Sequence, residues 1–161
     1  MSDKKILTML EQEGRLSAAQ IAERLGKPKK EIEARIAELE KKGIIRRYKA
    51  VINWEKTGVE DVFAFIEVKV TPQRGRGFDA VAERILQFPE VHSLYLLSGA
   101  YDLHVVVQGR SMKEVAYFVA EKLAPLENVQ STATHFVLKK YKVDGDLLEI
   151  KEEAKRLPVV A

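Results

Sequence analysis

The sequence predicts an α+β protein in which an N-terminal helix-turn-helix domain of the winged type precedes a C-terminal ferredoxin-like domain of βαββαβ order. Apolar residues recur at helical spacing in three short segments within residues 3–42. From residue 62 onward, period-two runs and helical segments alternate as strand, helix, strand, strand, helix, strand. Residues 1–58 hold 14 Lys+Arg against 9 Asp+Glu, whereas residues 59–161 hold 13 against 15. Surface charge is often uneven, but this imbalance favours a polyanion as the partner of the first part alone.

The composition marks four segments along the chain. A helix-turn-helix domain is expected over residues 1–50, and a polar stretch around Gly58 makes 51–61 a linker. The βαββαβ domain is expected over 62–145, and a charged tail over 146–161.

The first two helices have sequence signals at their ends. Helix one is expected over residues 3–13, with Gly14 as its stop. Helix two opens at Ser17, and the spacing of Ser17 and Gln20 is that of a capping box. Gly26 suits the left-handed residue that ends a helix. The turn to the next helix is therefore tight, as in a helix-turn-helix unit.

The third helix is expected over residues 28–42, with proline in its first turn. It is rich in both acidic and basic residues. Glu31 and Arg35 are four apart, as are Glu38 and Lys42, and such pairs partly cancel on a helix surface. In a helix-turn-helix unit this helix enters the DNA major groove with its N-terminal end first. A solvated amphipathic helix that reads no DNA is the alternative.

The run "IIRRYKAVIN" (44–53) reads as strand-like and predicts a basic hairpin after the third helix. Contacts to the phosphates of double-stranded DNA are expected from Lys27, Lys29, Lys30, Arg46, Arg47 and Lys49. Base readout is expected from exposed residues of the third helix, namely Lys30, Glu33 and Ala34. Arg35 either touches phosphate or pairs with Glu31 or Glu38, and the sequence slightly favours the pairing.

In the second domain, strands are expected over residues 62–70, 91–99, 101–109 and 129–143, and helices over 77–88 and 111–126. Ser111 and Glu114 have capping-box spacing. The first strand is expected to place Val62, Ala64, Ile66, Val68 and Val70 on one face and Phe63 and Phe65 on the other. The last strand is expected to place Thr132, Thr134, Phe136 and Leu138 on one face and Ser131, Ala133, His135 and Val137 on the other.

A four-stranded sheet with both helices on one face leaves its other face open. Phe63 and Phe65 would lie on that open face, where exposure of aromatic rings to water is unfavourable. The sequence therefore predicts a homodimer that packs sheet against sheet.

Composition excludes several classes of protein. The chain has no cysteine, which rules out disulfides, thiol catalysis and cysteine-ligated metal sites. No window approaches the roughly 18 apolar residues of a membrane span, and the N-terminus shows no signal peptide. A soluble, cytoplasmic protein without membrane contact and without a cofactor or metal is expected.

These features together resemble the Lrp/AsnC, or feast/famine, transcriptional regulators. The resemblance covers residues 3–145 and rests on the helix-turn-helix, on "RIAELEKKGIIRRYKAVIN" and on "SGAYDLHVVV". "INWEKTG", "IEVKVTPQRGRGFD" and "VQSTATHFVLKKYK" resemble a subgroup that regulates amino-acid metabolism. The resemblance implies binding to operator DNA and homodimers that assemble further, often to octamers. It also implies a ligand-sensing second domain that binds a small effector, often an amino acid, where dimers meet.

The resemblance also implies where the effector binds. Its pocket involves the turn after the second strand and part of the last strand, which here are Ser98, Gly99, Ala100, Tyr101 and Asp102, with Ser131, Thr132 and Thr134. The residues allow this chemistry, because a carboxylate such as Asp102 can hold an ammonium group. Equally, Gly99–Asp102 can form a simple hairpin turn in which Asp102 bonds its own backbone.

The chain departs from the family where the third helix begins. Members commonly have serine there and a small hydroxyl residue three positions later, and this chain has Pro28 and Glu31. The expected function is a sequence-specific regulator that responds to an effector. A ligand sensor or architectural protein with weakly specific DNA binding is the alternative.

An enzyme is the remaining possibility, because some siroheme decarboxylases resemble the same two-domain family. The only histidines are His92, His104 and His135, and they lack metal-ligand spacing. No Ser-His-Asp set or pair of catalytic carboxylates stands out. The sequence therefore does not predict an enzyme.

Overall fold

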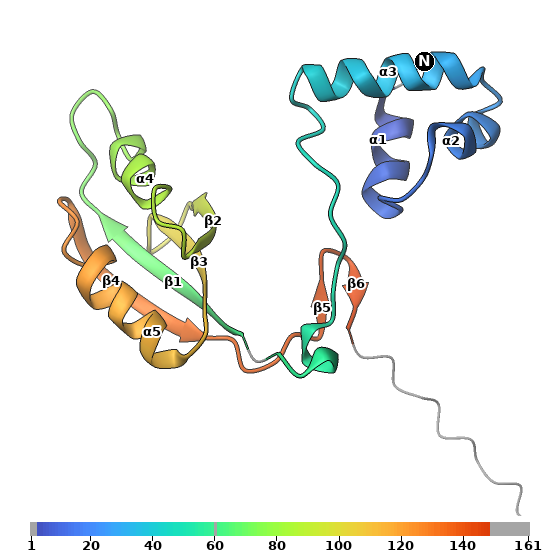
Figure 1. Ribbon diagram of the computed structural model, residues 1–161. Coiled ribbons are helices and arrows are strands. Elements are labelled where there is room, and N and C mark those ends of the chain that lie inside the picture. Colours follow the sequence, from blue (N-terminus) through green and yellow to red (C-terminus); the bar gives the residue numbers. More distant parts are fainter. Residues whose placement is uncertain (1–2, 60, 149–161) are drawn as a thin grey trace, which may run out of the picture. The chain divides into compact units, whose positions relative to one another are not determined.

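The computed structural model describes residues 3–59 and 61–148 (Figure 1). The chain divides between Ile52 and Asn53 into two compact units, which we describe separately. Within the described ranges, every helix is too short or too polar to cross a bilayer.

The first unit consists of three helices, α1 (Asp3–Gln12), α2 (Ala18–Leu25) and α3 (Lys29–Lys41) (Figure 1). Each amphipathic helix contributes its apolar face to one small core, as its 3.6-residue periodicity requires. The buried residues of this core are Ile6, Leu10, Ile21, Ala22 and Ile32. The three predicted helices are therefore present, and α1 ends one residue earlier than predicted.

Local signals set most of the helix ends. The capping box at α2 forms as predicted, since Ser17 Oγ accepts from the Gln20 N–H and the Gln20 side chain accepts from the Ser17 N–H. Gly26 is left-handed, with φ 62°. The prediction that Pro28 lies inside α3 is wrong: its ψ of 135° is extended, so it caps the helix and α3 begins at Lys29. Its carbonyl still accepts from the Ile32 N–H, which makes it the half-in residue of a helix start.

Residues 46–53 contain no strand, so the expected basic hairpin is not formed. A strand requires a partner for its backbone N–H and C=O groups, and no strand within residues 3–59 and 61–148 pairs with this segment. Its anchor is a side chain instead, because the Tyr48 hydroxyl donates to Glu40 Oε1 of α3 at 2.9 Å. The segment then leads into a short 3-10 helix, η1 (Trp54–Thr57).

The second unit is an antiparallel four-stranded sheet of order β2-β3-β1-β4. Its strands are β1 (Val62–Val70), β2 (Val91–Leu96), β3 (Leu103–Gly109) and β4 (Val129–Phe136). Two helices cover one face of this sheet (Figure 1). They are α4 (Asp79–Ile85) and α5 (Met112–Tyr117), and α5 continues as the π-helix η2 (Phe118–Leu123). This is the predicted ferredoxin-like arrangement.

The register of the sheet confirms the predicted faces of β1. Ala64, Ile66 and Val68 are fully buried and lie opposite Val107, Val105 and Leu103 of β3. On β4, the partners of these β1 residues are Phe136, Thr134 and Thr132, so the alternation predicted for the last strand is correct as far as residue 136.

The prediction of one long last strand to residue 143 is wrong. β4 ends at Phe136, whose partner Ala64 lies near the start of β1, and Leu138 is 92% exposed beyond it. A separate hairpin of β5 (Lys142–Val143) and β6 (Asp146–Leu147) follows. The two residues of its turn, Asp144 and Gly145, both have positive φ, as a tight hairpin turn requires. Most of the predicted tail lies outside the described residues.

The predicted capping box of α5 is half formed. Ser111 Oγ accepts from the Glu114 N–H at 3.1 Å, as expected. The Glu114 side chain accepts from the Arg110 N–H rather than from that of Ser111. The Glu114 carboxylate therefore stabilises the loop before α5 and does not accept from the N–H of the capping residue Ser111.

Candidate DNA-binding and effector-binding surfaces

The surface of α3 that points away from the core carries no acidic residue. Ile32 and Leu39 are buried and mark the side that faces the rest of the first unit. Successive residues of an α-helix are rotated by about 100°. The opposite side is therefore formed by four exposed residues, which we call the outward stripe: Lys30, Ala34, Ala37 and Lys41.

The glutamates of α3 lie on its two flanks, and each has a partner. Glu31 pairs with Lys27 at 3.7 Å, and Glu33 pairs with Lys29 at 3.3 Å. The predicted pair of Glu38 and Lys42 is present at 2.5 Å. Glu40 accepts from the Tyr48 hydroxyl. The acidity of this helix is thus largely neutralised within the first unit and lies beside the outward stripe rather than on it.

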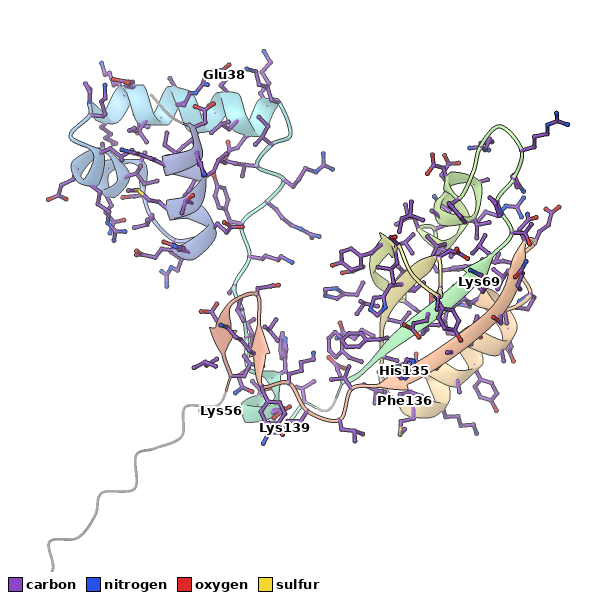
Figure 2. All side chains as sticks on the ribbon, turned by 180° about the vertical axis from the view of Figure 1, so that it is seen from behind. Glu38, Lys56, Lys69, His135, Phe136 and Lys139 are labelled. Atoms are coloured by element: carbon purple, nitrogen blue, oxygen red, sulfur yellow. The ribbon has the colours of Figure 1, made fainter. Side chains whose placement is uncertain are left out.

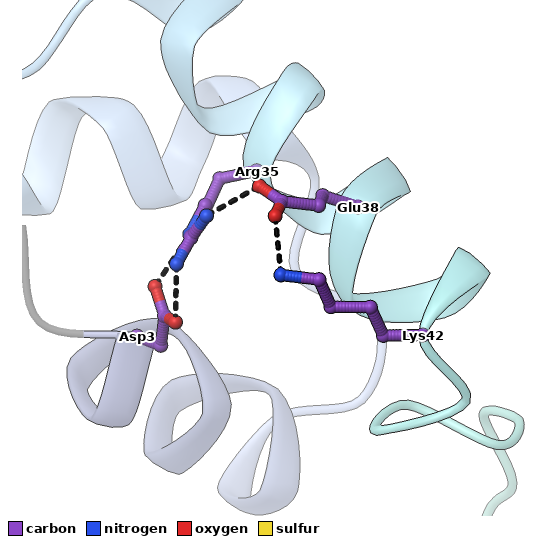
Figure 3. Close-up of polar contacts among 4 residues, drawn as sticks. All are labelled: Asp3, Arg35, Glu38 and Lys42. Carbon is purple, nitrogen blue, oxygen red and sulfur yellow. Dashed lines mark hydrogen bonds and ion pairs between the residues drawn. The ribbon is translucent and has the colours of Figure 1, made fainter.

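Arg35 belongs to a network that joins α1 to α3 (Figure 3). Its guanidinium donates two hydrogen bonds to the Asp3 carboxylate, each at 2.5 Å, and a third to Glu38. Glu38 in turn contacts Lys42, which completes a chain of alternating charges. The expected pairing of Arg35 with Glu31 is absent, whereas the pairing with Glu38 is present.

The network changes the protonation of its carboxyl groups. The hydrogen bonds from Arg35 have the largest effect on the pKa of Asp3 and lower it below the ordinary value. Desolvation opposes them, and the positive charge of Arg35 lowers the pKa further. The pKa of Glu38 is lowered first by the hydrogen bond from Lys42. Both carboxylates therefore remain ionised at neutral pH. The sequence offered no sign of Asp3 as a partner, because it lies 32 residues away from Arg35.

The nine residues predicted to meet DNA fall into groups. Lys27, Lys29 and Arg35 are held by carboxylates, as described above. Glu33 is also held, and it lines a hollow of about 390 Å³ together with Arg15 and Tyr48. Ala34 lies on the outward stripe. Four predicted cations are exposed and make no ion pair with any described residue: Lys30, Arg46, Arg47 and Lys49. Lys41 shares this property, and sequence reasoning missed it.

In the second unit, Asp102 ties the turn between β2 and β3 to strand β1. Its Oδ2 accepts from the Val70 N–H at 2.8 Å and its Oδ1 from Lys69 Nζ at 3.3 Å. The hydrogen bond from Val70 is the main reason why the pKa of Asp102 is lowered. The carboxylate takes the place of a ladder partner just beyond the last β1–β3 pair, which joins Val68 to Leu103. The alternative in which Asp102 bonds its own backbone is therefore wrong.

Within one chain, only some of the residues predicted to bind the effector lie on the same side of the sheet. Ser98, Gly99 and Ala100 are exposed at the tip of the turn, and Tyr101 is half-buried. On β4, Ser131 lies opposite Lys69, on the open face and at the same end of the sheet. Thr132 and Thr134 lie on the face that the helices cover.

Lys69 is the residue of this region that sequence reasoning missed (Figure 2). It lies between Asp102, with which it pairs, and Ser131 of the neighbouring strand. Because side chains alternate along β1, the sequence indicates that Lys69 lies on the open face of the sheet, but it assigns no role to the charge of this lysine.

The open face of the sheet is apolar at its centre and carries all three histidines of the chain. Phe65 is 42% exposed and its ring lies 5.3 Å from that of His104, while Phe63 contacts His92. The imidazole of His135 lies 3.3 Å from Glu67 (Figure 2). In the described ranges, no three side chains are grouped as metal ligands.

Two family models match the chain. One is described as the Lrp/AsnC ligand binding domain and matches residues 63–147. The other is a winged helix-turn-helix DNA-binding domain and matches residues 2–46. The chain is 50% identical over 158 residues to the uncharacterized HTH-type transcriptional regulator YugG of Bacillus subtilis (strain 168), covering 98% of this chain and 95% of that protein.

Solved structures of the same type are similar along most of their length. The transcriptional regulator NMB0573 of Neisseria meningitidis, in complex with L-Met, is 29% identical with a TM-score of 0.68, over 88% of this chain and 90% of that one. AsnC of E. coli is 23% identical with a TM-score of 0.68, over 88% and 93%, and so supports the fold. The relatives are regulators, and the decarboxylase alternative is set aside.

Proposed function

Because this chain belongs to the Lrp/AsnC family of transcriptional regulators, we propose that it binds operator DNA sequence-specifically and that an amino acid controls this binding or the assembly of the protein. The observation that carries the proposal is the charge arrangement of α3. Its glutamates are paired on the flanks, so the outward stripe presents only lysine and alanine to a polyanion. Binding of chromosomal DNA places the protein in the cytoplasm.

The phosphate contacts fall to cations that have no carboxylate partner. A lysine already paired with glutamate releases few counterions from DNA, whereas an unpaired exposed cation is available for a phosphate. We assign phosphate contacts to Lys41, Arg46, Arg47 and Lys49. Lys27 and Lys29 neutralise the flanks of α3, and Arg35 fixes the angle of this helix on α1 through Asp3.

The effector site is built around the turn between β2 and β3. The structure of NMB0573 is that of a complex with L-Met, and the similarity supports an amino acid as the effector of this chain. Ser98, Gly99, Ala100 and Tyr101 contact the effector, and Ser131 with Lys69 faces its carboxylate. Asp102 holds the turn, because Val70 and Lys69 already occupy its oxygens. Thr132 and Thr134 support the site from the helix-covered side.

A second copy of the chain covers the open face of the sheet. Phe65 and Tyr95 are 42% and 54% exposed there, and burial against an identical face removes that apolar surface from water. Dimers of this kind assemble further, to an octamer, where the β2–β3 turns of neighbouring dimers meet. An amino acid that binds one assembly more tightly than another shifts the population between them.

The proposal is tested by fluorescence anisotropy with the full-length protein. The probe is the DNA upstream of its own gene, and the control is shuffled DNA of the same length, at two salt concentrations. Tighter binding to the native fragment, changed by L-methionine or by pooled amino acids, supports the proposal. Equal and salt-sensitive binding to both fragments identifies an architectural protein instead.

A further inference from the structure

The outward stripe of α3 carries hydrogen-bond donors at its ends and none of the acceptors that side chains offer. Lys30 and Lys41 are eleven positions apart, which is about 16 Å along a helix. Ala34 and Ala37 lie between them and expose methyl groups only. The carboxylates that accept hydrogen bonds are held on the flanks by Lys29, Tyr48 and the network around Arg35.

This pattern restricts which base edges the stripe tolerates in a major groove. Lysine donates to the O6 and N7 of guanine, and an alanine methyl packs against the C5-methyl group of thymine. The amino groups of cytosine and adenine need an acceptor, and the stripe has none. The small alanines also allow the helix backbone to approach the base edges closely, which a longer side chain would prevent.

We propose that the outward stripe selects thymine methyl groups through Ala34 and Ala37 and a guanine through Lys30. This inference rests on the proposed DNA binding and specifies its target. The N-terminal part of such a helix contacts base edges, so Lys30 reads a base while Lys41 reaches a phosphate as the helix leaves the groove. Ala34 and Ala37 lie about 6 and 10 Å from Lys30 along α3. On a helix in the major groove, residues three to four apart meet successive base pairs, so the thymines follow about one and two base pairs from the guanine.

The test uses bases that lack a single group. The full-length protein first selects its preferred sequences from random DNA. Each thymine of the selected site is then replaced by deoxyuridine, which removes only the C5-methyl group and keeps base pairing. At two positions per half-site, this replacement is expected to weaken binding about fourfold, because the burial of one methyl group is lost. Replacing the guanine by 7-deazaguanine is expected to weaken binding at one position.

Variants of the stripe identify the side chains that read these groups. In Ala34→Gly, deoxyuridine at the corresponding position should no longer weaken binding further, and Ala37→Gly should behave likewise at the other position. In Lys30→Met, the effect of 7-deazaguanine should disappear. Lys5→Met is the matched control, because Lys5 is exposed on α1 and lies off the stripe. This variant should keep every effect of the modified bases.

The outcomes separate this inference from the proposed function. If selection yields no preferred sequence, the proposed sequence-specific regulation fails. If a preferred sequence emerges but deoxyuridine has no effect at any thymine, the outward stripe does not read methyl groups and only the inference is overturned. Loss of sensitivity in the stripe variants, with retention in Lys5→Met, establishes it.

Discussion

The division of cations into paired and unpaired groups predicts how DNA affinity responds to salt. Replacing Arg47 by alanine removes an exposed cation that has no partner in the described chain, whereas replacing Lys29 removes one that is held by Glu33. Each phosphate contact contributes about 0.9 to the slope of log affinity against log salt concentration. Both copies in a dimer lose the contact, so Arg47→Ala should lower the slope by about 1.8.

This change is large enough to measure. Between 50 and 200 mM salt, a slope difference of about 1.8 means that the unmodified protein loses roughly tenfold more affinity than Arg47→Ala. Lys29→Ala should change the slope by less than half as much, because its charge is already compensated. The assay is fluorescence anisotropy across a salt series with one operator fragment. Equal changes of slope in the two variants would refute the reasoning, since ion pairs on α3 would then not withhold lysines from DNA.

Three further predictions concern stability and assembly. Arg35 lowers the pKa of Asp3, so the ionised Asp3 carboxylate stabilises the fold fully above the ordinary pKa of 3.8, and this stabilisation disappears as the pH falls through the lowered pKa. Melting curves between pH 7 and pH 2.5 should therefore show a smaller acid-induced drop in Tm for Asp3→Asn than for the unmodified protein. Ile32→Ala empties part of the core of the first unit and should reduce the free energy of unfolding by about 2–5 kcal/mol in urea titrations, with unchanged melting of the second unit as the internal control. Phe65→Lys places a charge at the centre of the open face and should give monomers in sedimentation velocity. Tyr141→Lys is the control, because Tyr141 lies outside the four-stranded sheet, and this variant should remain dimeric. A dimeric Phe65→Lys would contradict the proposed interface.

Signals that act over a few residues could be read from the sequence. The Ser17–Gln20 cap, the left-handed Gly26 and the alternation of β1 all appear as predicted, because hydrogen bonds and side-chain directions at short range determine them. The order of strands and helices also followed from local periodicity. The location of the candidate DNA-binding surface on α3 follows from the same local rules.

Long-range contacts could not be read in this way. Nothing near Arg35 indicates Asp3, which α1 brings within hydrogen-bonding distance only when the three helices pack. Asp102 binds Val70 because two strands align, and β4 ends at Phe136, opposite Ala64 near the start of β1. The basic segment after α3 is strand-like in composition, but a strand forms only where another backbone pairs with it.

The sequence by itself determined the order of the helices and of the four sheet strands, the caps at Ser17 and Gly26 and the face that β1 buries, because these depend on neighbours one to four residues apart. Pairs four residues apart on α3, such as Glu38 with Lys42, are also local, whereas the tertiary structure alone decided that Arg35 pairs with Asp3. It also decided which predicted effector residues share a face of the sheet, because pairing between distant segments depends on how the whole unit packs.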